Sequence, residues 1–356
     1  MVSEYFSDIS NLRFLVFGLG FTSILIIFFK LRNYKAKRSI MRPVFYVSSA
    51  LVALSLWPIL LDMPANILIL YNNPGRGSIA FVFLISLILL IFLIFERDRY
   101  FKREKVINNL YNKLVINRVQ SEYSFQDLNY EIVVIIPAFN EEKNLGKVLD
   151  EIPNNINNKP IGVIVVDDGS EDDVSLVCKN KENIILVNHL INRGGGAALR
   201  TGYQIAKLLG AKIVVTIDAD GQHQPKEIST LIMPIINNDA DVVIGSRFLD
   251  GDYSGVYIRK IGIKVFNIII NLLFGSNITD CTSGYRAFNL DKLTQINLIQ
   301  DQYHTAELLI EAMKRKFVIK EVSVEIIQRF SGASKKGTNA FYAYSFLKTV
   351  ISTWLR

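Results

Sequence analysis

The sequence predicts an α/β domain with a mainly parallel sheet, preceded by an all-α membrane domain of three transmembrane helices. Three long apolar runs occupy the first hundred residues, and short β-branched runs alternate with helix-like stretches from residue 131 onward. We expect the membrane domain at 1–97, a helical linker at 98–128, the α/β domain at 129–340 and an amphipathic C-terminal helix at 341–356.

Composition excludes several other classes of protein. The chain has 356 residues, a net charge of +7 and 50% hydrophobic residues. The uneven distribution of the apolar residues excludes a fully soluble protein, a disordered chain and a pure multi-span channel. Two cysteines exclude a disulfide framework. Because the basic residues cluster beside the apolar runs, the expected partner of this charge is a lipid bilayer and not a nucleic acid.

The three apolar runs lie at 12–29, 43–61 and 78–95. Each approaches the length of about 20 apolar residues that crosses a hydrocarbon core of about 30 Å. A buried helix of a soluble core is the alternative for each run. Basic residues fill the loop after the first run and the segment after the third. The positive-inside rule therefore predicts a multi-pass protein of the cell or an endoplasmic-type membrane, with its N-terminus outside and everything beyond residue 96 in the cytoplasm.

Five apolar, β-branched runs predict the strands of the sheet, at 131–137, 161–167, 183–188, 212–218 and 241–245. The helix-like stretches between them lie at 141–152, 171–180, 195–209 and 225–237. Continuous apolar runs are typical of parallel strands that are buried on both faces, and ligands bind at the carboxyl ends of such strands. The polar residues expected at those ends are Asn140, Glu141, Asp167, Asp168, Asp218 and Asp220.

The segment Asp218-Ala219-Asp220 places two carboxylates on the same side of an extended chain, with Gln222 and His223 after it. Hard oxygen ligands that leave open positions suit Mg²⁺ or Mn²⁺ bound together with a substrate diphosphate. A strand-end aspartate that caps the next helix is the alternative. His223 by itself is more typical of a packing or supporting residue than of a metal ligand.

A Gly-rich turn at 192–198 enters a helix. Such a turn lets backbone amides approach an anion or a nucleotide. It matches neither a Walker sequence nor G-x-G-x-x-G. The alternative is a helix N-terminus that packs tightly on the sheet.

Five motifs in order resemble a known family. They are Pro137-Ala-Phe-Asn-Glu141, Val166-Asp-Asp-Gly-Ser170, Asn192-Arg-Gly-Gly-Gly196, Asp218-Ala-Asp-Gly-Gln-His223 and Gly245-Ser-Arg247. The series resembles the family-2 inverting glycosyltransferases with a GT-A fold. Asp280-Cys-Thr-Ser-Gly-Tyr-Arg286 and Arg329-Phe-Ser-Gly-Ala-Ser-Lys335 make it similar to the dolichyl-phosphate mannose and glucose synthase branch. The N-terminal part resembles a small three-span membrane domain of unknown function that sometimes precedes such transferases.

The resemblance, which covers residues 131–340, implies roles for particular residues. It implies that Asp220 and Gln222 hold Mg²⁺ or Mn²⁺, that Asp218 lies beside the metal, and that Asp220 and Arg247 are catalytic. Arg247 and Arg259 match positions for the acceptor phosphate. The positions implied to bind the nucleotide sugar are Pro137, Phe139, Glu141, Val166, Asp168, Asp218 and Ala219, with Arg329 and Lys335 from a mobile loop. Three residues depart from the family: Phe139 where Tyr is common, Ile263 in place of a Ser near the acceptor phosphate, and Ser331 in place of a second loop Arg.

The implied reaction moves a hexose from a GDP- or UDP-sugar to dolichyl or polyprenyl phosphate on the cytoplasmic membrane face, giving a lipid-linked phosphosugar for glycan or protein glycosylation. A lipid phosphate is already an anion, so cations position it and no general base is needed. The donor stays open among GDP-mannose, UDP-glucose and a UDP-N-acetylhexosamine, and a homo-oligomer stays open as well. The alternatives are a processive polysaccharide synthase, whose Gln/Arg-x-x-Arg-Trp motif the sequence lacks, and a non-enzymatic membrane scaffold or flippase partner with a relic transferase domain.

The stretch 257–274 is apolar with basic residues near its start. We expect it to lie on the bilayer as an interfacial helix near the acceptor headgroup. A core helix is the alternative.

Overall fold

The structure is a computed structural model that describes residues 18, 22, 106–123, 125, 128–179, 181, 183–250, 257–327, 329 and 339–356. The three predicted spans lie outside the described residues, apart from the single residues 18 and 22. Among the residues that are described, no helix has the length and apolar character needed to cross a membrane. The chain divides into two compact units, 1–108 with 355–356, and 109–354. The fold and the site below belong to the second unit.

The second unit is built on an eight-stranded sheet with the order β2-β3-β1-β5-β7-β6-β8, and β4 pairs with β3. Five strands coincide with the predicted runs: β1 (Ile132–Ala138), β3 (Lys159–Asp167), β4 (Ile184–Asn188), β5 (Ile213–Thr216) and β6 (Val242–Ser246). Parallel pairing joins β4, β3, β1 and β5 in one continuous series. The prediction of an α/β domain is therefore confirmed, and these four strands form its parallel part.

Three further strands were not predicted: β2 (Asn155–Ile156), β7 (Arg286–Asn289) and β8 (Ile319–Ser323). Strand β7 lies between β5 and β6 and is antiparallel to both, and β8 pairs in parallel with β6. These strands are short and carry no continuous β-branched run, so the pattern that found the other five does not mark them. The sheet is consequently mixed.

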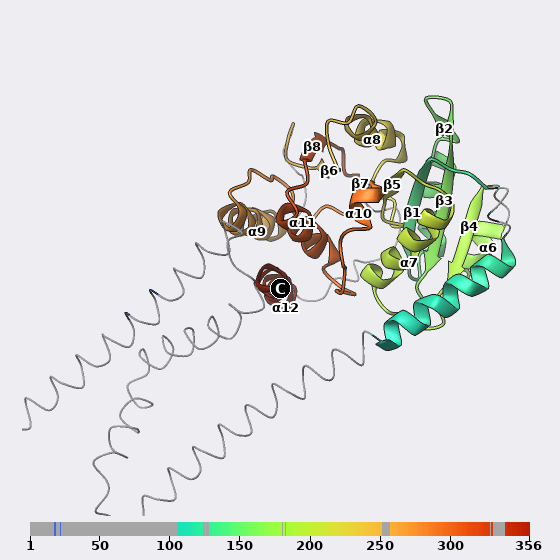
Figure 1. Ribbon diagram of the computed structural model, residues 1–356, viewed down its shortest axis with the longest axis horizontal. Coiled ribbons are helices and arrows are strands. Elements are labelled where there is room, and N and C mark those ends of the chain that lie inside the picture. Colours follow the sequence, from blue (N-terminus) through green and yellow to red (C-terminus); the bar gives the residue numbers. More distant parts are fainter. Residues whose placement is uncertain are drawn as a thin grey trace, which may run out of the picture. The chain divides into compact units, whose positions relative to one another are not determined.

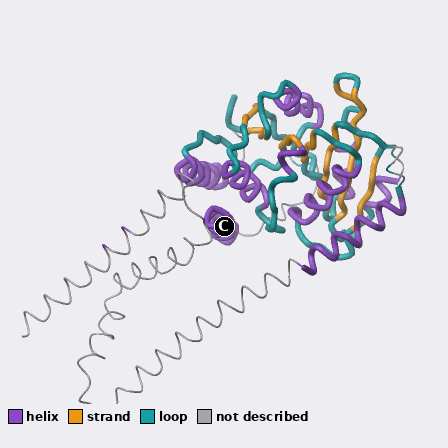
Figure 2. Tube along the Cα trace, viewed as in Figure 1, coloured by secondary structure: helices purple, strands orange, loops and turns teal. Residues whose placement is uncertain are grey.

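Helices cover both faces of the sheet (Figures 1 and 2). One face carries α5 (Glu142–Glu151), α6 (Val174–Lys179), the short 3₁₀ helix η2 (Pro225–Glu227) and α8 (Ile228–Ile236). The other face carries α7 (Gly195–Leu208), α10 (Leu290–Leu293) and α11 (His304–Lys314). Side chains of β1 alternate between the two apolar cores, with Val133 and Ile135 in one and Ile132, Val134 and Ile136 in the other. All five are buried, so β1 is the centre of the fold.

Three more helices pack against the α7 side of this unit. They are the linker helix (residues 106–122), α9 (Tyr257–Phe274) and α12 (Asn339–Leu355). Val115 and Val119 bury one side of the linker helix, and Tyr123, directly after it, accepts a hydrogen bond at its Oη from the Leu186 backbone N–H at 3.2 Å. Residues 109–123 thus pack beside β4 within the second unit.

Helix α9 has apolar residues on two sides. Ile263, Phe266 and Ile270 are buried in the core. The outward side exposes Ile261, Val265, Ile268 and Leu272, each by 45–66%. This helix is therefore anchored in the core on one side and presents an apolar stripe on the other. Its contact with a bilayer stays a prediction.

Candidate active site

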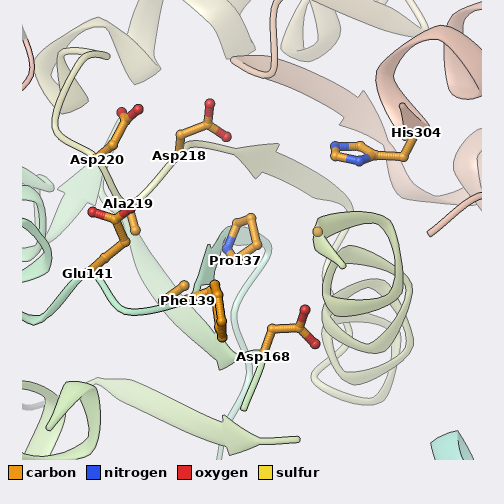
Figure 3. A pocket seen from close by; sticks show the side chains of 10 residues that line it. Pro137, Phe139, Glu141, Asp168, Asp218, Ala219, Asp220 and His304 are labelled. Atoms are coloured by element: carbon orange, nitrogen blue, oxygen red, sulfur yellow. The ribbon is translucent and has the colours of Figure 1, made fainter. Parts of the chain in front are cut away.

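A pocket of about 280 Å³ opens at the carboxyl ends of β1, β3 and β5, as expected for a parallel sheet (Figure 3). Its walls come from the ends of these three strands and from the N-termini of α7 and α11. The lining residues are Pro137, Ala138, Phe139, Glu141, Asp168, Gly195, Asp218, Ala219, Asp220 and His304. Seven of the residues implied by the resemblance are thereby brought together: Pro137, Phe139, Glu141, Asp168, Asp218, Ala219 and Asp220.

Asp218 and Asp220 follow β5 and supply two carboxylates to one end of the pocket. The Asp218 side chain is about half exposed, whereas Asp220 is more enclosed. Burial, and then the neighbouring Asp218 carboxylate, raise the pKa of Asp220 above its ordinary value. The backbone N–H of Gln222 donates to Asp220 Oδ1 at 3.1 Å. Two neighbouring carboxylates suit a hard divalent cation, because such a cation offsets the unfavourable charge on Asp220.

The Gln222 side chain does not line the pocket, and the described residues contain no group of three or more His, Cys, Asp or Glu side chains arranged to hold a metal. The residues that fit Mg²⁺ or Mn²⁺ are the two aspartates, and a diphosphate is the natural source of the remaining oxygens. Gly284 lies directly beside them, since a Cβ at this position would stand 3.1 Å from Asp218 Oδ1.

His223 lies next to the Asp218 carboxylate. Its Nε2 lies 3.6 Å from Asp218 Oδ2, and its ring packs against Tyr285 with centroids 4.9 Å apart. Its Nδ1 is buried with no hydrogen-bond partner among the described residues. His223 also forms a β-bridge to Ile326. The packing role expected for an isolated histidine agrees with these contacts.

That bridge brings Arg329 to the pocket. The Arg329 guanidinium donates to Glu141 Oε1, while Asn144 Nδ2 donates to Glu141 Oε2 at 2.6 Å. Both members of the Arg329–Glu141 ion pair are largely buried. Arg329 is thus held beside Glu141 at the wall of the pocket. Lys335, on the same expected loop, lies outside the described residues.

Asp168 is a buried carboxylate of the pocket that accepts several hydrogen bonds. It accepts from the backbone N–H of Arg193 at 3.1 Å to each oxygen, from Gly194 N–H at 2.6 Å, and from His189 Nδ1 at 2.7 Å. Asp168 therefore fastens the Gly-rich turn to the end of β3. Its contact with a nucleotide remains a prediction.

The Gly-rich turn packs tightly, as one of the two alternatives expects, while its approach to an anion or a nucleotide stays a prediction. A Cβ at Gly196 would stand 2.3 Å from the Gln300 carbonyl oxygen, and Gly194 has φ +94°. These two glycines allow close packing of the turn. Gly195 instead lines the pocket. Gly194 and Gly196 thus allow the close packing, and Gly195 between them borders the pocket.

Arg247 lies outside the pocket lining, at the end of β6. Its Nε donates to Asp280 Oδ2 at 2.5 Å and its Nη2 donates to Asp280 Oδ1 at 2.6 Å and to Thr282 Oγ1 at 2.6 Å. The Asp280 backbone N–H donates to Glu321 Oε1 on β8 at 3.0 Å. The guanidinium is therefore oriented by a buried carboxylate. Arg259 lies in the first turn of α9, and its side chain lies outside the described residues.

Val166 and Ile263 both lie outside the pocket lining. Val166 is buried in the middle of the sheet and does not line the pocket. Its backbone pairs with Pro137 across β1 and β3, so its position supports the wall from behind. Ile263, which replaces a serine of the family, is buried in the core on the inner side of α9. Ser331 lies outside the described residues.

The structure adds residues that sequence reasoning did not select. His304 begins α11 and faces the pocket, where a Cβ on Gly195 would stand 3.5 Å from its Cε1. His189 is buried between Asp168 and Thr201 Oγ1, 3.0 Å from the latter. No predicted strand directly precedes His304. His189 follows a predicted strand, but as an isolated histidine outside any of the quoted motifs. Their positions depend on which segments the fold brings together.

The fold and the pocket agree with the comparisons to known proteins. A family model described as Glycosyl transferase family 2 matches residues 133–296. Over 236 residues the chain is 36% identical to the UDP-N-acetylglucosamine–dolichyl-phosphate N-acetylglucosaminyltransferase of Methanococcus voltae, with 60% of this chain and 92% of that protein covered. The chain belongs to glycosyl transferase family 2 and is a glycosyltransferase.

Other relatives carry related names. The polyprenol monophosphomannose synthase of Mycolicibacterium smegmatis is 30% identical over 219 residues, which cover 58% of this chain and 82% of that protein. Among solved structures, glucosyl-3-phosphoglycerate synthase from Mycobacterium tuberculosis, in complex with Mn²⁺, UDP and phosphoglyceric acid, superimposes with a TM-score of 0.52 at 19% identity, covering 66% of this chain and 82% of that chain. This likeness supports the GT-A-like fold that the motifs imply.

Proposed function

We propose that this enzyme transfers one sugar from a UDP- or GDP-sugar to dolichyl or polyprenyl phosphate, with inversion at the anomeric carbon. The observation that carries the proposal is the pair Asp218 and Asp220 at the end of a pocket whose other walls suit a nucleotide. Relatives named for transfer to dolichyl phosphate and for polyprenol monophosphomannose synthesis support the acceptor class. The donor panel described below identifies which sugar is transferred.

The donor half rests on charge. Mg²⁺ or Mn²⁺ at Asp218 and Asp220, when bound, offsets the negative charge that develops on the departing diphosphate. Phe139 offers an aromatic face and Glu141 a carboxylate on the nucleoside side of the pocket. Arg329, held at Glu141, is near enough to the pocket to add positive charge beside the phosphates if the expected loop closes.

The acceptor half rests on Arg247. A lipid phosphate needs a positioned cation and no base, because its oxygen is already nucleophilic. The two hydrogen bonds that the Arg247 guanidinium donates to Asp280 hold its plane in one orientation. A preoriented arginine loses less conformational freedom when it binds a phosphate, which suits the position implied by the resemblance.

Helix α9 connects this arginine to the proposed membrane surface. Asn267 on its inner side donates to the Thr279 carbonyl and accepts from the Cys281 N–H at 3.0 Å, on either side of Asp280. Its outer side exposes the stripe Ile261, Val265, Ile268 and Leu272. We propose that this stripe lies in the cytoplasmic leaflet of the membrane that the three predicted spans cross, and that it brings the acceptor headgroup toward Arg247.

A donor panel tests the reaction. Purified full-length protein in detergent with Mn²⁺ receives GDP-mannose, UDP-glucose or UDP-N-acetylglucosamine together with a polyprenyl phosphate, and lipid products are analysed by mass spectrometry. We expect one donor to give a lipid phosphate carrying a single sugar, and chelation or Asp220→Asn to abolish it. A polymer would support the processive alternative, and donor hydrolysis without any lipid product would contradict the proposed acceptor.

Liposome flotation tests the membrane surface. The Ile268→Asp and Leu272→Asp substitutions should reduce binding of a fragment 106–356 to anionic vesicles, if this fragment folds as shown by its thermal unfolding. Leu176→Asp, at an exposed apolar residue on the opposite side of the sheet, is the matched control. Equal loss of binding in all three variants would contradict a specific role for α9.

A further inference from the structure

The linker helix contacts the turn that borders the donor pocket. Tyr111 Oη accepts a hydrogen bond from the Leu190 backbone N–H at 2.6 Å. Asn112 Oδ1 accepts from Arg193 Nη1 at 2.7 Å. The Arg193 guanidinium carbon lies 4.5 Å from the centre of the Tyr111 ring, within the range of a cation–π contact. Two neighbouring residues of this helix therefore hold the segment 190–193 at three points.

Arg193 depends on these contacts. It is partly buried, and this burial lowers the pKa of its guanidinium. Its Nη2 is buried with no hydrogen-bond partner among the described residues. Asn112 is itself 6% exposed, so its amide oxygen has little access to water as an alternative partner. A partly buried cation of this kind is stabilised in its position by the few partners that it has.

The backbone of the same residue reaches the pocket. The N–H of Arg193 and that of Gly194 donate to the Asp168 carboxylate, which lines the pocket. His189 donates to Asp168 from a second direction, and its ring packs edge-on against Tyr111 with centroids 5.6 Å apart. The linker helix thus touches both groups that position this carboxylate.

We propose that Tyr111 and Asn112 are positioning residues of the donor site, which set the affinity for the nucleotide through Arg193, His189 and Asp168. The turn contains Gly194 in the left-handed region at φ +94°, and a glycine-rich turn loses much conformational freedom when it is ordered. Because Tyr111 and Asn112 already order the turn in the free protein, nucleotide binding does not have to supply the free energy for this ordering. This inference rests on the proposed function, because it takes the Asp168 wall to be the nucleotide wall.

Nucleotide binding by the full-length protein in detergent tests the inference. Isothermal titration with UDP and with GDP in the presence of Mn²⁺ gives Kd, and thermal unfolding gives Tm. Asn112→Leu keeps the volume but removes the acceptor for Arg193. We expect it to weaken nucleotide binding about tenfold, the change that corresponds to one lost hydrogen bond of a charged group. The donor KM should rise in parallel, with kcat and the acceptor KM unchanged.

Two further variants separate positioning from general stability. Tyr123→Phe removes the hydrogen bond that Leu186 N–H donates at the other end of the helix, away from the turn, and should leave Kd unchanged. Asn112→Asp keeps an oxygen opposite Arg193 and should retain wild-type affinity. If Asn112→Leu and Tyr123→Phe change Kd equally, or if Asn112→Leu lowers only Tm, the inference is overturned. If the wild-type protein binds neither nucleotide, the proposed donor site is wrong and the inference fails with it.

Discussion

Removal of the Arg247 side chain should destabilise the protein much more than loss of an exposed ion pair. Arg247 and Asp280 have side chains only 8% and 0% exposed, and two hydrogen bonds of 2.5 Å and 2.6 Å join them. Arg247→Ala leaves the Asp280 carboxylate buried without its cation. Breaking a buried pair in this way costs about 3–5 kcal/mol, because the remaining charge is desolvated.

The expected change in Tm follows from this free energy and from the size of the compact unit. A domain of about 150–250 residues loses about 2–4 °C in Tm for each kcal/mol, so Arg247→Ala should lower Tm by about 6–20 °C. The double variant Arg247→Ala/Asp280→Ala removes both charges and should recover part of the loss. The exposed pair Arg118–Glu122 is the matched control, and Arg118→Ala should cost less than about 1 kcal/mol.

Thermal unfolding of the purified variants by circular dichroism measures these differences. An Arg247→Ala variant that loses no more stability than Arg118→Ala would refute the reasoning, since the pair would then behave as a solvated one. The measurement also decides how acceptor kinetics are interpreted. A loss of acceptor use counts as evidence for phosphate binding only when it is measured at a temperature where the variant remains folded.

Three other outcomes are expected. Asp220→Asn should raise the Tm of the metal-free protein, because burial and Asp218 raise the pKa of Asp220 and so penalise its ionised form; the stability that protonated Asp220 contributes is present at low pH and is lost as the pH rises through the raised pKa. The same substitution should remove both the Tm increase with Mn²⁺ and metal-dependent turnover. An undiminished Mn²⁺ shift would contradict the assignment. Gly196→Ala should destabilise the protein by about 1–3 kcal/mol in chemical denaturation, since its Cβ would stand 2.3 Å from a backbone oxygen. Gly146→Ala, within helix α5, should be neutral or stabilising, because its Cβ would meet Val177 Cγ1 at an ordinary 3.6 Å. His304→Ala should raise the donor KM severalfold with little change in Tm, and an unchanged KM would exclude it from the donor site.

The strands of the parallel half were predictable because each is buried on both faces and must therefore be apolar along its whole length. Residues 132–136 of β1 show this most clearly, with every side chain buried. Strand β7 is different. Arg286 is buried there through hydrogen bonds to the carbonyls of Ser283, Thr305 and Cys281, so a charged residue occupies a position that a local pattern reserves for an apolar one.

The candidate site divides in the same way. Asp168, Asp218 and Asp220 follow predicted strands, and parallel strands bring their carboxyl ends to one edge, so their convergence was foreseeable from the chain alone. His304 reaches the pocket from the start of a helix more than eighty residues beyond Asp220, which no local periodicity connects to it. Arg247 and Asp280 both lie in motifs that the sequence shows, but their pairing across 33 residues became visible only in three dimensions.

The sequence by itself determined the class of fold, the family and the aspartate pair, because these depend on local hydrophobic patterns and on short motifs at strand ends. Only the tertiary structure decided which strand separates β5 from β6, that Asp168 is fastened to the Gly-rich turn, and that Tyr111 and Asn112 of the linker helix reach that turn. These are contacts between segments far apart in the chain. They are set by the packing of the whole unit, which local sequence patterns do not encode.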